Sequence, residues 1–205
     1  MTDTLAPLLE ALRACTAWLR AAKKRGAVIG GVAASIHGQP RVTQDIDLVA
    51  LVPDDEWAAF LVVGVKFGIE PRRRDALAFA TTTRVLLLRH KPSGVELDVS
   101  LGAIAFEHRM VERALTRRVR GVSFRVATAE DVVVMKALAL RPRDVADIEG
   151  ILAAVPELAI ERVRRDLRAL SESLEGPDYL SELDRIIAHH RRSAPRVTRK
   201  PKRKL

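Results

Sequence analysis

Two aspartates separated by one residue lie in a short run of apolar residues. Asp45 and Asp47 alternate with Ile46 and Leu48, and this alternation predicts a strand over residues 45–52. Side chains two apart on a strand point to the same face, so the two carboxylates lie side by side and repel each other. A hard divalent cation that prefers carboxylate oxygens would relieve this repulsion. The pattern therefore predicts a Mg²⁺ site on this strand.

A glycine pair precedes the aspartates and offers the complementary chemistry. Gly30 and Gly31 follow the apolar run 27–29, which predicts a buried strand, and precede helix-forming residues 32–37. Glycine lets a backbone approach an anion closely, and the N-terminus of a helix directs free N–H groups towards it. Phosphates at this turn and a cation at the aspartates together predict a nucleoside triphosphate site.

Further acids alternate with apolar residues on a later strand. Residues 84–90 and 95–101 predict a hairpin, and in the second arm Glu96, Asp98 and Ser100 alternate with apolar residues. One face of this arm should face the core while the other presents carboxylates. Glu96 and Asp98 share that face, so either of them could add a further acid to the site.

The motif over residues 28–48 reads G-G-x-A-x-x-x-H-G-x-x-R-x-T-x-D-I-D-L from Gly30 onwards. It resembles the signature of DNA-polymerase-β-type nucleotidyltransferases. More narrowly, it resembles the abortive-infection toxin nucleotidyltransferases and their uncharacterised bacterial relatives. The wider superfamily often has Gly-Ser at the position of Gly30-Gly31, so the match is better to the narrower group.

A second stretch, residues 130–148, resembles the downstream motif of the same toxin-type group. By position, this resemblance places Lys136 and Asp147 near the nucleotide. Lys136 is expected in mid-helix among apolar residues, where an ammonium group needs an anion. A triphosphate oxygen is the favoured anion, and an ion pair with Asp144 or Asp147 is the alternative.

The resemblance implies an enzyme that moves a nucleoside monophosphate from a nucleoside triphosphate, such as ATP, to a hydroxyl acceptor. It implies two Mg²⁺ ions, with Mn²⁺ as a possible substitute, bridged by Asp45 and Asp47. The resemblance also places a third metal-binding acid on the strand after the hairpin, which gives Asp98, with Glu96 on the same face as the alternative. By this resemblance Asp98 would hold the metal on the attacking oxygen and accept its proton. The implied nucleotide-binding set consists of Gly30, Gly31, Arg41, Thr43, Lys136 and Asp147.

The implied fold is α/β (α+β), a small mixed sheet flanked by helices with a C-terminal helical subdomain. We expect a nucleotidyltransferase core over 1–127, the helical subdomain over 128–190 and a basic, disordered tail over 191–205. Thr4 should cap the first helix, and the pattern of residues 106–120 predicts an amphipathic helix before a short strand at 122–126. The arginine-rich loop 71–75 is expected to be solvated rather than phosphate-binding.

Charge is unevenly distributed along the chain of 205 residues. The formal net charge is +9, and residues 191–205 carry eight Lys/Arg and no acid, which leaves a net charge of +1 on the preceding 190 residues. Such a tail either binds polyanions in a salt-sensitive way or acts as a solubilising terminus. Cys15 is the only cysteine, so no internal disulfide can form. Without an apolar run of membrane-spanning length or a basic N-terminal segment, we expect a cytoplasmic protein that does not enter a membrane.

Several acceptors fit this sequence. A toxin-type enzyme acting on the 3′ end of tRNA fits the narrower resemblance and the basic tail, and the resemblance also implies a possible antitoxin protein as partner. An aminoglycoside- or lincosamide-type transferase shares the first motif but has no need of a basic tail. A protein-directed transferase is a further alternative. A catalytically silent binding module is disfavoured because all three candidate acids are present.

Overall fold

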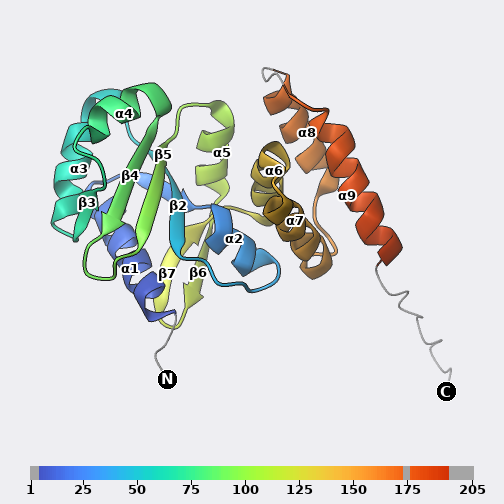
Figure 1. The fold of residues 1–205 in the computed structure, drawn as a ribbon, viewed down its shortest axis with the longest axis horizontal. Coiled ribbons are helices and arrows are strands. Elements are labelled where there is room, and N and C mark those ends of the chain that lie inside the picture. The colour runs from blue at the N-terminus through green and yellow to red at the C-terminus, as the bar shows by residue number, and fades with distance from the viewer. Residues whose placement is uncertain (1–4, 173–175, 194–205) are drawn as a thin grey trace.

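The computed structural model describes residues 5–172 and 176–193. Seven strands of this part of the chain form one mixed sheet (Figure 1): β1 (Arg25–Val28), β2 (Asp45–Leu51), β3 (Ile69–Pro71), β4 (Val85–His90), β5 (Glu96–Leu101), β6 (Leu115–Val119) and β7 (Val122–Val126). Their order is β3-β4-β5-β2-β1-β7-β6. In this order β2, which carries the two aspartates, is the central strand. It is antiparallel to β1 and parallel to β5.

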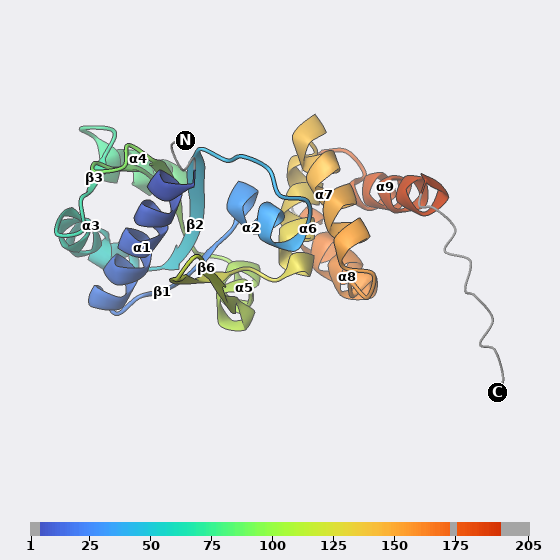
Figure 2. The ribbon, with the colours of Figure 1, turned by 90° about the horizontal axis from the view of Figure 1, so that it is seen from below.

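Helices flank the sheet and continue beyond it. They are α1 (Ala6–Ala21), α2 (Gly30–His37), α3 (Trp57–Val65), α4 (Ala76–Thr83), α5 (Ala105–Arg113), α6 (Ala129–Ala139), α7 (Pro142–Ala154), α8 (Ile160–Ser171) and α9 (Tyr179–Ser193), with a 3₁₀ turn at Asp54–Glu56. Figure 2 shows α6–α9 gathered beside α2, at the end of the molecule away from β3 and α3. None of the helices of the described chain is long and apolar enough to cross a membrane.

The buried apolar stripe of α1 packs this helix against α3. Trp18 is fully buried, stacks on Phe60 of α3 with ring centroids 4.0 Å apart, and donates its indole N–H to the Phe60 carbonyl at 2.8 Å. A buried tryptophan therefore has its polar atom satisfied as well as its apolar surface covered. Cys15 lies in the same stripe, where burial raises the pKa of its thiol to about 12. It is a small core residue.

Most expected elements are confirmed, including the α/β class, the hairpin β4–β5 and the helical character of the chain after residue 128, which forms α6–α9. The helix expected over 106–120 is wrong in its second half. α5 ends at Arg113, and residues 115–119 form the edge strand β6, which pairs with β7. β3 and α4 were not expected at all. The predicted cap, Thr4, lies outside the described residues. The domain boundaries at 127 and 190 stay a prediction.

Candidate active site

The glycine turn folds around one of the strand aspartates. Gly30 has a left-handed backbone (φ +60°), and a Cβ built on it would lie 1.8 Å from Oδ2 of Asp47. The backbone N–H of Ile29 donates to the Asp47 carbonyl at 2.9 Å, and Gly31 donates its N–H to the Asp47 carboxylate. Only glycine combines this backbone conformation with so close a contact. The turn and the carboxylate therefore form one structural unit.

Parallel pairing of β2 and β5 brings four carboxylates to one face of the sheet. In this register Asp45 is opposite Glu96, and Asp47 is opposite Asp98. Burial raises the pKa of Asp47, and the negative charge of Asp45 raises it further. Burial also raises the pKa of Asp98, against the opposing effect of the Arg72 guanidinium. These carboxylates are thus held close together without full charge compensation.

Each carboxylate already has a partner within the chain. Thr43 donates its hydroxyl to Asp45 at 2.8 Å, the glycine turn donates to Asp47, and Arg72 donates to both Asp98 and Glu96. Across residues 5–172 and 176–193, no group of three or more His, Cys, Asp or Glu side chains is arranged as a preformed metal site. The donor set nevertheless fits Mg²⁺ in its chemistry, because it offers carboxylate oxygens from adjacent strands. Side-chain rearrangement must accompany the binding of a cation.

A second set of acids lies on the helical side of the glycine turn, and here each acid is paired with cations. Arg41 donates two hydrogen bonds to Asp147, from Nε to Oδ1 at 2.8 Å and from Nη2 to Oδ2 at 2.9 Å. Lys136 Nζ lies 2.7 Å from Asp144 Oδ1 and 2.9 Å from Asp147 Oδ2. Burial alone would raise the pKa of Asp147, but the hydrogen bonds from Arg41 and Lys136 lower it below its ordinary value. The pKa of Asp144 is lowered in the same way, against its burial, by Arg141 and Lys136.

This paired cluster reaches the glycine turn directly. A Cβ on Gly31 would meet Thr43 Oγ1 at 2.9 Å and Arg41 Nη2 at 3.2 Å, so both side chains line the turn. The structure thus gathers the sequence-predicted nucleotide residues around Gly31, with Lys136 held behind Arg41 by their shared partner Asp147. The ion pair that the sequence offered as the alternative role of Lys136 is present. The phosphate role stays a prediction.

A cleft of about 700 Å³ opens beside these groups. Its lining combines residues before and at the start of β2 with the end of the β4–β5 hairpin and the start of α7: Arg41, Val42, Thr43, Gln44, Asp45, Gly94, Glu96 and Arg143. Carboxylates and guanidinium groups both face this space, which suits a ligand that carries a metal ion and phosphates. The cleft is large enough for a small-molecule ligand.

Arg72 is the site residue that the sequence analysis missed. The loop 71–75 was expected to be solvated, yet the Arg72 side chain is only 22% exposed and is bound between Glu96 and Asp98. The expectation holds for Arg73, which pairs with Asp75 at the surface. Nothing in the local sequence distinguishes Arg72 from Arg73 and Arg74, because its position depends on the strand order.

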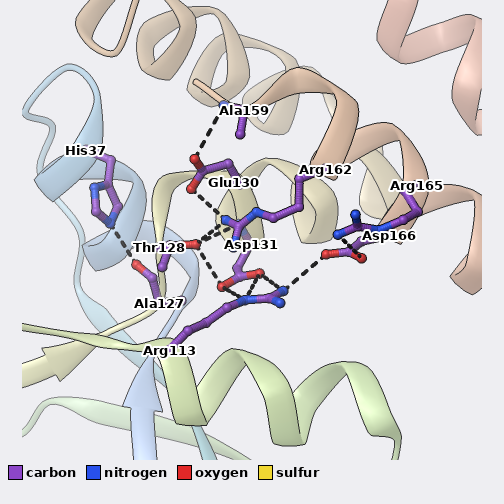
Figure 3. A network of polar contacts seen from close by, with 10 residues as sticks. All are labelled: His37, Arg113, Ala127, Thr128, Glu130, Asp131, Ala159, Arg162, Arg165 and Asp166. Atoms are coloured by element: carbon purple, nitrogen blue, oxygen red, sulfur yellow. Dashed lines mark hydrogen bonds and ion pairs between the residues drawn. The ribbon is translucent and has the colours of Figure 1, made fainter. Parts of the chain in front are cut away.

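A separate ionic network joins α5 to α6 and α8 (Figure 3). Arg113 of α5 binds Asp131 of α6, with Nε at 3.0 and 2.9 Å from the two carboxylate oxygens, and its Nη2 reaches Asp166 of α8 at 3.2 Å. The Thr128 side chain accepts the backbone N–H of Asp131 and so caps the N-terminus of α6. His37 pairs its Nε2 with the Ala127 carbonyl at 2.7 Å. These groups satisfy one another and act in structure rather than in chemistry.

Comparisons with known proteins agree with this geometry. A family model described as "Nucleotidyl transferase of unknown function (DUF2204)" matches residues 8–180. No curated protein matches the chain in sequence. The solution structure of the antibiotic-resistance factor ANT(2″)-Ia is similar to it, with a TM-score of 0.54 and 18% identity over 93% of this chain and 100% of that one.

Two further solved structures have the same fold. The crystal structure of ANT(2″)-Ia in complex with adenylyl-2″-tobramycin gives a TM-score of 0.53 and 18% identity over 81% of this chain and 97% of that one. An antigenic nucleotidyltransferase-like protein from Paracoccidioides brasiliensis gives 0.51 and 18% identity over 86% of this chain and 92% of that one. At this level of identity the likeness concerns the fold alone.

Proposed function

Because the chain belongs to the nucleotidyl transferase family DUF2204, we propose that it transfers a nucleoside monophosphate from a nucleoside triphosphate to the 3′ end of an RNA, with tRNA as the acceptor. The observation that carries the proposal is the register of β2 and β5, which sets Asp47 opposite Asp98 beside the Gly30 turn. Carboxylates on one sheet face next to a phosphate-binding turn are what phosphoryl transfer needs.

The proposed reaction is a substitution at the α-phosphorus. The acceptor hydroxyl oxygen forms a bond to that phosphorus, the bond to the bridging oxygen of the β-phosphate breaks, and pyrophosphate leaves. Asp98 accepts the hydroxyl proton, and Asp45 and Asp47 together with Asp98 would hold Mg²⁺. When bound, the divalent cation would supply neutralisation of phosphate charge and Lewis-acid activation of the acceptor oxygen.

The triphosphate would be oriented by groups around the glycine turn. Arg41 and Thr43 line the turn and also face the cleft, where they can donate to phosphate oxygens. Lys136 is bound to Asp147, which it shares with Arg41. A phosphate anion would compete with Asp147 for both cations. In this proposal the acid keeps the ammonium and guanidinium groups in place until nucleotide enters.

The acceptor is argued from charge. The cleft carries Asp45 and Glu96 but also Arg41 and Arg143, so it is not the purely acidic surface that a polycationic aminoglycoside would favour. Residues 191–205 add eight positive charges that only a polyanionic acceptor can use. The second candidate, an aminoglycoside acceptor, is favoured by the fold shared with ANT(2″)-Ia in its adenylyl-2″-tobramycin complex.

The test is a transfer assay with the full-length protein, Mg²⁺ and each of the four α-labelled nucleoside triphosphates in turn. Purified tRNA, total RNA, lysate protein and aminoglycosides are offered separately as acceptors. We expect label on tRNA, and none in EDTA or with Asp47→Asn. Label on an aminoglycoside or on protein alone would replace the RNA proposal, and no label with any acceptor would contradict transfer itself.

A truncated protein separates the acceptors further. Deleting residues 193–205 removes six basic residues, and it should weaken tRNA binding and flatten its salt dependence, because fewer counterions are then released. The matched control replaces the same six side chains with Gln, which keeps the length of the chain. Equal salt slopes for all three proteins would show that the tail does not bind RNA.

A further inference from the structure

Arg72 occupies an unusual position for an arginine in a surface loop. It follows β3, its backbone N–H donates to the Leu87 carbonyl of β4 at 2.9 Å, and its side chain crosses to β5. There Nη1 donates to Glu96 and Nη2 to Asp98. One guanidinium group thus bridges the two carboxylates that stand opposite Asp45 and Asp47, and Glu96 also accepts a hydrogen bond from Arg89 at 3.0 Å.

One atom of Arg72 is left unsatisfied by this arrangement. Its Nε is buried, and no acceptor in the described chain lies within hydrogen-bond distance of it. A buried donor without a partner is costly, and such groups in folded proteins call for an explanation. The two arginines that follow it differ, since Arg73 pairs with Asp75 at the surface and Arg74 is exposed.

The four strand acids also lack a preformed metal arrangement in the described residues, although their register places them together. Asp98 and Glu96 are the two strand acids bound by cations of the chain itself, Asp98 by Arg72 and Glu96 by Arg72 and Arg89. An arginine fork and a divalent cation recognise the same carboxylate oxygens, and the cation binds them at shorter range with twice the charge.

We propose that Arg72 is the resident counter-ion of Asp98 and Glu96, and that it is exchanged for the divalent cation when the site is loaded. The Arg72–Asp98 pair and a cation on Asp98 are then mutually exclusive. In the cation-free protein the guanidinium group holds the acids together, and its departure frees Nε from an unsatisfied position. This inference rests on the role of Asp98 as metal ligand in the proposed function.

The first test measures Mn²⁺ binding to the full-length protein without nucleotide, by the loss of the free-ion electron paramagnetic resonance signal. Arg72→Gln removes the competing cation, so we expect Mn²⁺ to bind about tenfold more tightly than to wild type. Arg74→Gln changes the same charge in the same loop and should alter affinity less than about twofold. Equal affinities of the two variants, or weaker binding to Arg72→Gln, would overturn the exchange.

Asp98→Asn separates this inference from the proposed function. If the exchange is correct, Arg72→Gln should no longer tighten Mn²⁺ binding when combined with Asp98→Asn. If Asp98→Asn alone leaves Mn²⁺ affinity unchanged, the metal-ligand assignment fails. If Asp98→Asn weakens binding while Arg72→Gln has no effect, the assignment stands and only the exchange is wrong.

The second test uses the wild-type chain and needs no substitution. Phenylglyoxal modifies accessible guanidinium groups, and peptide mass spectrometry reports each arginine separately. Arg72 should react several-fold faster in Mg²⁺ than in EDTA, whereas Arg74 should react at the same rate in both. An Arg72 rate that does not change with Mg²⁺ would overturn the proposal.

Discussion

The surroundings shift the pKa values of the acids on the strands and of the acids on the helices in opposite directions. Asp47 and Asp98 have raised pKa values, because they are partly buried beside other carboxylates. Asp144 and Asp147 have lowered pKa values, because Lys136, Arg141 and Arg41 hydrogen-bond to them. The difference separates two uses of buried charge. The strand acids keep a demand for positive charge, which suits ligand binding, whereas the helix acids have theirs met within the chain.

The largest expected effect comes from a substitution in the strand set, which consists of Asp45, Asp47, Glu96 and Asp98. Asp47→Asn should lower nucleotidyl transfer by about a thousandfold or more, since phosphoryl transfer depends on charge neutralisation worth several kcal/mol. The variant should remain folded, because removing one of several crowded carboxylates relieves repulsion. Steady-state transfer and circular dichroism check the two parts. Glu70→Gln on edge strand β3 is the control, and transfer by Asp47→Asn within a few-fold of wild type would contradict the assignment.

A substitution in the helix set, which consists of Asp144, Asp147 and the cations bound to them, should instead lower the free energy of unfolding. Asp144→Asn leaves the buried Lys136 with one carboxylate fewer, and the free energy of unfolding should fall by about 3 kcal/mol. Urea denaturation of the cation-free protein measures it. Asp55→Asn, an exposed aspartate, should change this free energy by no more than about 0.5 kcal/mol. Comparable effects of the two substitutions would show that the helix set is not a structural ion pair.

Lys136 belongs to the helix set but is predicted to act for the nucleotide as well. Lys136→Gln should weaken binding of a nucleoside triphosphate by about tenfold, because one charge-assisted hydrogen bond to phosphate is lost. It should also lower the melting temperature, since Asp144 and Asp147 lose a partner. Calorimetric titration of the folded variant decides between the roles. Unchanged affinity together with a lowered melting temperature would leave Lys136 with the ion pair alone.

The smallest expected effect is in the pH dependence of stability. A carboxylate whose folded pKa is raised destabilises the ionised native state, so for Asp47 stability should increase as the pH falls through that raised pKa towards 3.8. For Asp144 the stabilisation is complete above 3.8 and is lost as the pH falls through the lowered folded pKa.

Unfolding of wild type, Asp47→Asn and Asp144→Asn over a pH series in EDTA checks these signs. The stability difference between Asp47→Asn and wild type should shrink on acidification before that of Asp144→Asn does. We expect the Asp47 effect to stay below about 1 kcal/mol, because solvent screens a partly exposed group. If the two stability differences shrink over the same pH range, the distinction between the two sets of acids is wrong.

Local patterns were sufficient to predict the residues that the fold brings together around the glycine turn. The alternation at Asp45 and Asp47, and again at Glu96 and Asp98, depends only on strand periodicity. The parallel pairing of β2 with β5, which sets these acids opposite each other, was not predicted and is seen only in the structure. The chemistry of these residues was predicted from their types and still requires the assays above.

The failures concern partners that are distant in sequence. Residues 115–119 were assigned to a helix, although the chain turns sharply at Arg120 and Gly121, both with positive φ (46° and 83°), and pairs Val119 with Val122. Gly121 before a β-branched residue is a hairpin signal that outweighed helical periodicity in the fold. Arg72 could not be placed, because its position depends on β3 joining the sheet beyond β4.

The two glycines of the turn are unequal in what could replace them during evolution. At position 30 any side chain would collide with the carboxylate of Asp47, so a change there can persist only together with a change at position 47. At position 31 an added Cβ would meet the side-chain ends of Thr43 and Arg41, which can rotate away, and a serine could hydrogen-bond to them. Position 31 should therefore accept substitutions during evolution, in line with the Gly-Ser of the wider superfamily that the motif resembles. Position 30 should remain glycine for as long as position 47 is aspartate.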